Sequence, residues 1–389
     1  MPRTFLFSLV IVGFVALLSK SLLRRRLTFW TSAILIGLAI LLWFSKLDSS
    51  LGRIHIWKLS LRMLANQTFW QGIGHNQFNI HYNHLQAGYF KERGLSSKEA
   101  LLANDGYYAF NEFMHWGIEW GWWAGALLLF LFALFLYQNW RLVKNRGRFN
   151  VEFLCTMLLW PIAVGCWVGY PLHKPYLLIY ASCVSLMLIV SIIPLKPALR
   201  NGIFVIIGFL TVSWMALHGW EQRNAKMMIE EARELWMIGD KPGAIEQLRN
   251  YCIKQPDAIP HNEILSKWLW LVGEEREAIN WMIGHHQYHC NQRIHETLGQ
   301  WYTGAGKYEL SSIHLHTSLY ITPHLLRSRA LLADYYYLNR NLDSARYWAK
   351  EVLYTPPKIE NAKASELKRA AANWLLPDHP EGLPFQLLN

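Results

Sequence analysis

The sequence predicts an all-α protein in which a polytopic bundle of transmembrane helices is followed by a soluble domain of helical repeats. Several runs of about 20 apolar residues, the length that a spanning helix needs, occur before residue 221. After that residue, amphipathic helical patterns alternate with turn signals, and similar residues recur 34 positions apart. An apolar half and a polar half together explain a chain of 389 residues that is 52% hydrophobic but has a mean hydropathy of only +0.09.

Two transmembrane helices, at residues 5–18 and 27–44, are predicted in the region 1–48. The first run has its main basic cluster behind it and no small-residue cleavage site, which favours a spanning helix over a cleaved signal peptide. Four more spans are predicted in the region 116–220, at residues 116–137, 151–170, 176–193 and 203–220.

Basic residues predict the orientation of these spans. They gather in three connections, at residues 24–26, 141–148 and 196–200, and Lys and Arg are retained on the cytoplasmic side of a membrane. The amino terminus, the loop at 49–115, the short turn at 171–175 and the domain at 221–389 are then all on the outer side. Because only two spans precede the loop, we expect the chain to be the carboxyl-terminal part of a longer protein, or a reduced relative of one.

The formal net charge of +11 is spread over short loops and the polar half. This distribution favours anionic membrane lipids or a diphosphate-bearing substrate as partners, and it argues against nucleic acid. Of the five cysteines, three fall in apolar runs, and Cys252 and Cys290 show no CxxC or Cys/His ligand spacing. These two could pair with each other if the polar half is extracytoplasmic. We expect no metal site and no cofactor.

The region 49–115 is polar, basic and aromatic, and we expect most of the function to reside there. Three helices are predicted in it. The first covers residues 53–67, where apolar residues recur three and four positions apart. The second runs from Phe78 and stops at Gly94, and the third is capped by Ser96 or Ser97 and extends to residue 104.

The domain at 221–389 contains an internal repeat. Large residues and a closing proline recur 34 positions apart: Leu298 is followed by Leu332, and Pro323 by Pro357. This pattern resembles the tetratricopeptide repeat (TPR), which stacks helix pairs into a curved binding surface; the alternative is an irregular helical bundle. We expect this TPR-like domain to dock a partner protein or an acceptor.

A further resemblance is carried by five motifs, which follow one another from the loop into the next span. They are GRxxxW, GIGxxxF, YxxxQxxYF, YYAFNE and ExGxxxG, formed by Gly52, Arg53, Trp57; Gly72, Gly74, Phe78; Tyr82, Gln86, Tyr89, Phe90; Tyr108, Asn111, Glu112; and Glu119, Gly121, Gly125. In this order they resemble the O-antigen ligase and polymerase superfamily of bacterial membrane glycosyltransferases. The resemblance covers residues 27–195.

The resemblance implies a metal-independent enzyme of the bacterial inner membrane, with its carboxyl-terminal domain in the periplasm. Such enzymes transfer a glycan from a polyprenyl-diphosphate carrier at the outer face. In a ligase the acceptor is the lipid A core or a protein, and in a polymerase it is another lipid-linked unit; the motifs do not separate the two. The resemblance also implies that the substrate site is shaped by Trp57, Tyr82, Gln86, Tyr89 and Tyr108.

Catalytic roles can be matched to residue chemistry. A departing lipid diphosphate gains negative charge, which the planar arginine fork holds with two hydrogen bonds. Arg53 matches the family's arginine in GRxxxW and is our candidate; the alternative is an interfacial arginine on lipid headgroups. The acceptor hydroxyl needs a base, and histidine suits neutral pH. Family ligases carry that histidine where this chain has Phe110, so we expect His115, or next Glu112, to act with Asn111 on the acceptor.

Other residues of this region have plainer interpretations. Three histidines, His75, His81 and His84, lack a tight ligand pattern. Four tryptophans within 116–123 fit an interfacial belt at the end of a span. Glu119 lies inside a predicted span and must be paired or functional; we favour a pairing partner, such as an arginine of the loop. The rival function is a non-catalytic membrane scaffold that recruits envelope proteins through the repeat domain, which Phe110 and the small number of spans favour.

Overall fold

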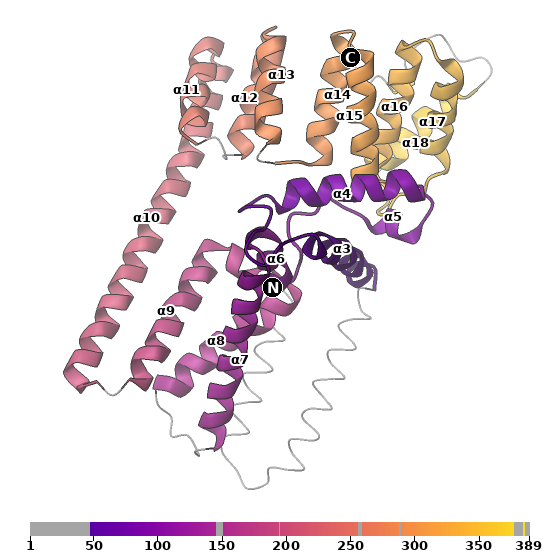
Figure 1. The fold of residues 1–389 in the computed structure, drawn as a ribbon. Coiled ribbons are helices and arrows are strands. Elements are labelled where there is room, and N and C mark those ends of the chain that lie inside the picture. Colours follow the sequence, from indigo (N-terminus) through magenta and orange to yellow (C-terminus); the bar gives the residue numbers. More distant parts are fainter. Residues whose placement is uncertain are drawn as a thin grey trace. The chain divides into compact units, whose positions relative to one another are not determined.

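The computed structural model describes residues 47–144, 151–193, 195–255, 259–287, 289–376 and 384–385. Within these ranges every regular element is helical, from α3 at Leu47–Ala65 to α18 at Ala362–Trp374 (Figure 1). The all-α prediction is therefore confirmed for the described residues. Two compact units are present: a first unit of Met1–His75 with Tyr108–Ala225, and a second unit of Asn76–Tyr107 with Lys226–Asn389.

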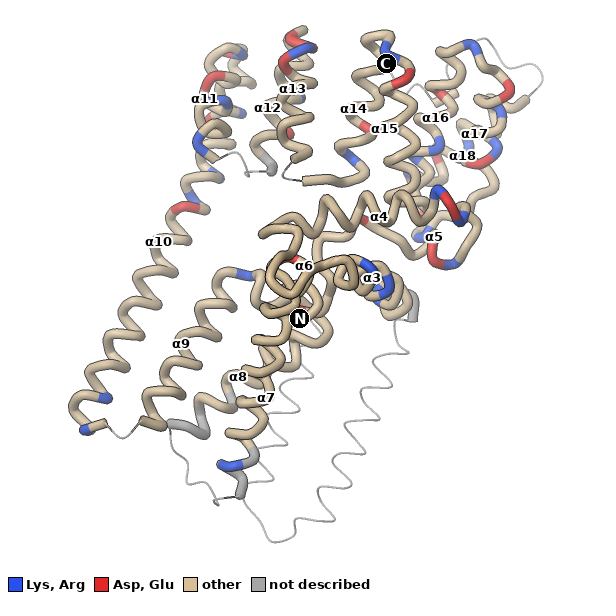
Figure 2. Tube along the Cα trace, viewed as in Figure 1, with Lys and Arg blue, Asp and Glu red and all other residues tan. Residues whose placement is uncertain are grey.

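The first unit contains apolar helices that are suited to a membrane. After α3 come α6 at Glu112–Trp120, α7 at Trp122–Lys144, α8 at Val151–Val168, α9 at Pro175–Ile192 and α10 at Pro197–Met237. The part of α10 from Lys226 on belongs to the second unit. Three of these, α7, α9 and α10, are long and apolar enough to cross a bilayer, and α8 adds a shorter apolar stretch at Leu158–Val168. Charged residues are sparse along α7, α8, α9 and the first half of α10 (Figure 2), and Phe130, Val205 and Phe209 are exposed. Exposed apolar side chains of this kind are stable when lipid covers them, so this surface indicates a membrane protein.

The structure corrects two of the predicted spans. The helix predicted at 116–137 is interrupted at Gly121, whose φ of 101° is a conformation that only glycine adopts readily, so α6 ends there and α7 begins. The span predicted at 203–220 is part of α10, a single helix of 41 residues. Helices α8 and α9 agree with the spans predicted at 151–170 and 176–193 to within two residues. The spans predicted at 5–18 and 27–44 lie outside the described residues.

The second unit begins with two of the helices that were predicted in the loop. Helix α4 covers Phe78–Arg93 and ends at Gly94, and α5 covers Lys98–Leu102 with the Ser97 side chain accepting a hydrogen bond from the Ala100 amide. The end of α4 at Gly94 and the cap of α5 at Ser97 are confirmed, whereas α5 ends at Leu102 and not at the predicted residue 104. The first loop helix, predicted at 53–67, is α3 of the first unit and begins earlier, at Leu47.

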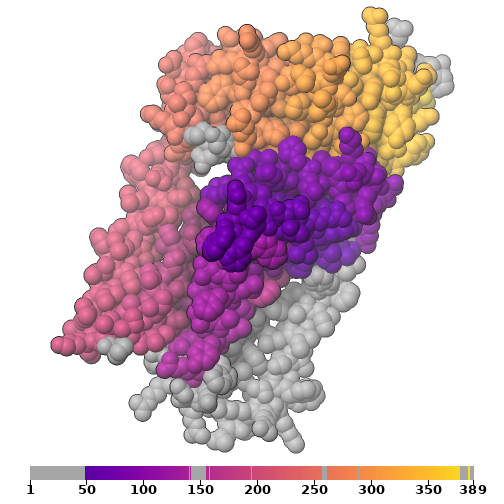
Figure 3. Space-filling model, viewed as in Figure 1, coloured from indigo at the N-terminus to yellow at the C-terminus, as the bar shows by residue number. Residues whose placement is uncertain are grey.

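Seven more helices of this unit follow one another with short connections. They are α11 at Lys241–Lys254, α12 at Ile259–Leu271, α13 at Glu275–His286, α14 at Gln292–Gly304, α15 at Tyr308–Ile321, α16 at Leu326–Leu338 and α17 at Leu342–Tyr354. Helices α16 and α17 begin 34 residues after α14 and α15. From α12 to α17 each helix packs against the next, and the space-filling view shows this layer in orange to yellow (Figure 3). Its largest core cluster includes Leu248, Leu265, Met282, Ile294 and Leu298.

Residues 76–107 belong to the second unit, although the sequence places them in one loop with 49–75 and 108–115. Three buried amide side chains of α4 explain this packing. The Cys290 amide donates to Asn79 Oδ1 at 2.8 Å, and Asn83 Nδ2 donates to the Cys290 carbonyl at 2.6 Å. Gln86 Nε2 donates to the Ile321 carbonyl at 2.6 Å. Hydrogen bonds between buried groups hold α4 against the segment at Cys290 and against the end of α15.

Candidate functional site

Helix α6 carries the central polar side chains of the first unit, and Asn111 fixes where it begins. The Asn111 side chain accepts a hydrogen bond from the Met114 amide at 3.0 Å, which is the usual helix N-cap. Its Nδ2 also donates to the Trp167 carbonyl at 3.2 Å, near the end of α8. Phe110 precedes the cap with a positive φ of 52°, which turns the chain into the helix.

The GIG segment holds the other end of α6. The Ile73 amide donates to the Ile118 carbonyl at 3.0 Å, and the Gly74 amide donates to the Glu119 carbonyl at 2.9 Å. A β-carbon on Gly72 would lie 2.4 Å from backbone atoms of Ile118 and Glu119, so only glycine allows this close approach. The segment thus satisfies carbonyls that a helix end leaves without partners.

One face of α6 presents a buried imidazole–carboxylate pair. His115 Nε2 lies 3.2 Å from Glu119 Oε1, and both side chains are 2% exposed. The Ala109 amide donates to His115 Nδ1 at 3.3 Å, so Nε2 carries the proton that Glu119 accepts. His75 Nδ1 lies 3.4 Å from the second Glu119 oxygen. The partners of Glu119 are therefore histidines and not the arginine that we expected.

These contacts explain the protonation of the pair. Burial lowers the pKa of His115, and the hydrogen bond to Glu119 only partly offsets that effect. Burial acts to raise the pKa of Glu119, but the hydrogen bond from His115 and the neighbouring histidines outweigh it, and the net pKa is lowered. At neutral pH the pair is therefore a neutral imidazole beside an ionised carboxylate.

A second imidazole–carboxylate pair lies against the first. His173 Nδ1 is 2.9 Å from Glu112 Oε2, and the Leu172 amide donates to Glu112 Oε1 at 2.6 Å. Because a carboxylate only accepts, His173 carries its proton on Nδ1, and Nε2 keeps a lone pair. The His173 and His115 rings meet edge to face with centroids 4.1 Å apart. Glu112 is fully buried, whereas the His173 side chain is 10% exposed.

Aromatic rings join Arg53 to these pairs. The Arg53 guanidinium lies over the Phe110 ring at 5.3 Å, and its Nη1 donates to the Val168 carbonyl at 3.1 Å. Phe110 meets Tyr170 at 5.4 Å, and Tyr170 stacks on Tyr108 at 4.0 Å. Tyr108 in turn lies 5.2 Å from the His173 ring. Burial lowers the pKa of Arg53, but arginine remains charged at neutral pH.

Five of the predicted site residues thus come together in the first unit: Arg53, Tyr108, Asn111, Glu112 and His115. Trp57 also belongs to this unit, on α3. Its indole N–H is buried and has no hydrogen-bond partner among the described residues. The residue that sequence reasoning missed is His173. It lies in the short turn between two spans, on the side predicted to face outward with the loop, and that placement was the available signal.

The other predicted substrate residues lie in the second unit. The Tyr82 hydroxyl donates to Gln86 Oε1 at 2.8 Å, and both side chains are fully buried. Tyr89 donates a hydrogen bond to Glu99. The structure places these three residues in contacts within α4, between α4 and α5, and, through Gln86, with the end of α15. His81 and His84 also belong to α4, whereas His75 stays with Glu119 in the first unit.

A cation could be held in the first unit by His115, Glu119 and His173, whose ligand atoms lie within 4.8 Å of one another. To bind through Nε2, His115 would have to release the proton that it now donates to Glu119. His115 and Glu119 already pair with each other, and His173 pairs with Glu112 through Nδ1, an arrangement that is suited to moving a proton.

No family model and no curated protein matches this chain.

Proposed function

We propose that this protein transfers a glycan from a polyprenyl-diphosphate carrier to an acceptor hydroxyl, as O-antigen ligases do, at the outer face of the bacterial inner membrane. The acceptor is the lipid A core or a protein. The observation that carries the proposal is the His173–Glu112 pair, an imidazole whose Nδ1 is held by a buried carboxylate. The half-buried Arg53 of the same unit is joined to it through three aromatic rings.

His173 is the general base of this proposal, in place of the His115 that the sequence favours. Both His115 nitrogens have partners, Ala109 and Glu119, whereas His173 Nε2 has no hydrogen-bond partner among the described residues. A carboxylate on Nδ1 fixes the tautomer and stabilises the imidazolium that forms when Nε2 takes a proton. His115 packs on the ring of His173 and acts as a positioning residue.

The reaction is a nucleophilic substitution at the anomeric carbon of the donor. The acceptor oxygen attacks this carbon while His173 Nε2 takes the hydroxyl proton. The bond from the anomeric carbon to the diphosphate oxygen breaks, and the lipid diphosphate leaves with the electron pair. Arg53 binds the negative charge that develops on it; a guanidinium has five N–H donors, and one of them is used on Val168.

The test uses the full-length protein in detergent with a synthetic polyprenyl-diphosphate glycan and either lipid A core or an acceptor protein. We expect His173→Asn to lower the transfer rate by about 100-fold or more, as loss of a general base does. His218→Asn is the matched control, because His218 also lies near a glutamate, Glu221, at 4.0 Å in the first unit. Equal rates for the two variants would contradict the role of His173.

A further inference from the structure

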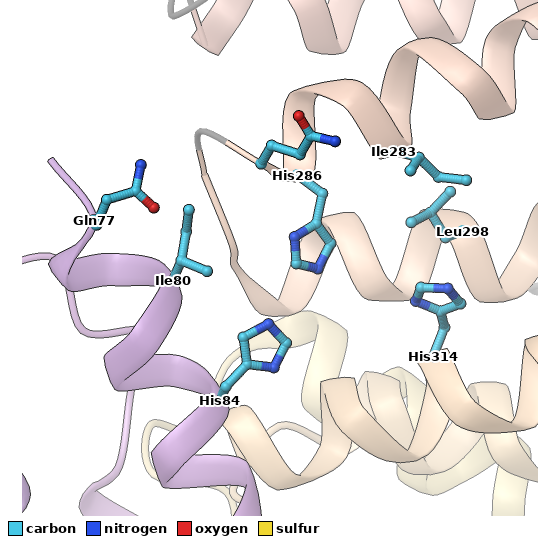
Figure 4. A pocket seen from close by; sticks show the side chains of 8 residues that line it. Gln77, Ile80, His84, Ile283, His286, Leu298 and His314 are labelled. Carbon is cyan, nitrogen blue, oxygen red and sulfur yellow. The ribbon is translucent and has the colours of Figure 1, made fainter. Parts of the chain in front are cut away.

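The second unit contains a separate cluster of histidines around Cys290, which the proposed reaction does not use. His84 comes from α4, His286 from the end of α13, and Cys290 from the turn before α14. One ligand atom of each lies within 4.8 Å of the others. His84, His286 and His314 line a cavity of about 490 Å³, and their rings project toward the same space (Figure 4). The cavity offers an ion a path to the cluster.

We propose that this cluster is a zinc site, with His84, His286, His295 and Cys290 as its ligands. Two nitrogens and a sulfur already converge: His295 Nε2 is 3.1 Å from His286 Nε2 and 3.5 Å from Cys290 Sγ. Tetrahedral zinc has bonds of about 2.0–2.1 Å to nitrogen and about 2.3 Å to sulfur, which separate two nitrogens by about 3.3 Å and a nitrogen from a sulfur by about 3.6 Å. The observed nitrogen–nitrogen and nitrogen–sulfur distances are close to these values.

The His84 ring completes the set from the other side. It stacks on the His286 ring at 5.6 Å and meets the His295 ring edge to face at 6.1 Å. Closing the fourth bond requires the His84 ring to turn and move toward the other three ligands. Three nitrogens and one thiolate form a borderline-soft set that favours zinc over magnesium or calcium, which prefer oxygen.

The protonation states of the histidines suit metal binding. Burial lowers the pKa of His84 and of His286, and it lowers that of His295 well below its ordinary value, so all three rings are neutral at pH 7. Burial raises the pKa of the Cys290 thiol to about 12. Zinc must therefore displace the thiol proton, which passes to solvent on binding.

The surroundings hold the ligands in place. His295 Nδ1 lies 2.9 Å from His314 Nδ1, so a metal on Nε2 leaves the Nδ1 proton for His314 to accept. Asn79 and Asn83 hold the backbone of Cys290 on both sides with hydrogen bonds of 2.8 and 2.6 Å. The proposed ligands come from α4, α13 and the start of α14, and zinc would join these elements.

The experiment is metal titration of the full-length protein in detergent after treatment with a chelator. Zinc affinity is measured by competition with a chromophoric chelator, and Co²⁺ serves as the spectroscopic probe. We expect one zinc ion per chain, and a cobalt spectrum with intense tetrahedral bands and a thiolate-to-cobalt charge-transfer band. Cys290→Ala should remove the charge-transfer band, and His286→Asn should weaken zinc binding at least 10-fold.

Two matched variants control for nonspecific effects. Cys252→Ala removes the other buried thiol of the second unit, and His316→Asn removes a histidine whose Nδ1 bonds to the Ser312 carbonyl at 2.9 Å. Both should bind zinc like the wild type. The proposal is overturned if wild-type protein binds no zinc, if its cobalt form lacks the thiolate band, or if Cys290→Ala and Cys252→Ala bind equally. The wild-type spectrum decides the question even if a variant fails to fold.

Discussion

Gly72→Ala should disrupt the candidate site although the added methyl group carries no polar atom. The new β-carbon would lie 2.4 Å from the backbone of Ile118 and Glu119, and backbone cannot yield as a flexible side chain does. The segment must move away and lose the hydrogen bonds from Ile73 and Gly74, each worth about 1 kcal/mol. Overpacking adds about 1–3 kcal/mol, so the total destabilisation is about 3–5 kcal/mol.

Activity should fall as well, because the displaced helix end carries Glu119, the partner of His115. A displacement of about 1 Å at a catalytic site can cost about 100-fold in rate. The assay combines thermal unfolding, followed by tryptophan fluorescence, with glycan transfer by the same preparation. Gly202→Ala in α10 is the control, since among the described residues its added β-carbon meets no atom within 4 Å apart from the adjacent backbone of its own helix. If Gly72→Ala unfolds and transfers like Gly202→Ala, the packing argument is wrong.

Two further predictions concern a buried histidine and a helix cap. Burial, with Lys358 and Arg329 nearby, lowers the pKa of His324 to about 4 in the folded state. In the unfolded chain the pKa of histidine is about 6.5. The contribution of neutral His324 to the free energy of unfolding is therefore fully present above pH 6.5 and is lost as the pH falls toward 4. This loss is at most about 3 kcal/mol, and His324→Gln should flatten the decline of the melting temperature between pH 7.5 and 5; an unchanged pH profile would contradict it. Asn111→Ala should lower the free energy of unfolding by about 1 kcal/mol and also slow glycan transfer. Asn361→Ala removes the same kind of cap from α18, so it should lower the free energy of unfolding by as much but leave transfer unchanged.

Local signals in the sequence were enough to predict several elements of the fold. Helix α4 ends at Gly94 and α5 begins at Ser97 because a glycine C-terminus and a serine cap act within a few residues. The 34-residue spacing of helix pairs was visible for the same reason: each pair repeats its own local pattern. The break at Gly121 was missed because the surrounding tryptophans and leucines make one continuous apolar run.

Long-range contacts could not be read from the sequence. Asn79, Asn83 and Gln86 look like the polar face of a helix, yet they bond to backbone more than 200 residues away, and this places α4 in the second unit. The pairing of Glu112 with His173 across 61 residues is of the same kind. Because neither residue belongs to a motif that includes the other, only the folded chain brings this pair together.

The measurement that tests the proposed function most directly is glycan transfer by Arg53→Gln. With purified full-length protein and a polyprenyl-diphosphate glycan donor, we expect the wild type to release polyprenyl diphosphate and form the glycosylated acceptor. Arg53→Gln should reduce both products at least 100-fold, because the leaving diphosphate loses its cationic partner. Arg62→Gln removes an exposed arginine from the same helix and should leave the rate unchanged. A wild-type protein without transfer activity, or an Arg53→Gln variant as active as Arg62→Gln, would contradict the proposal.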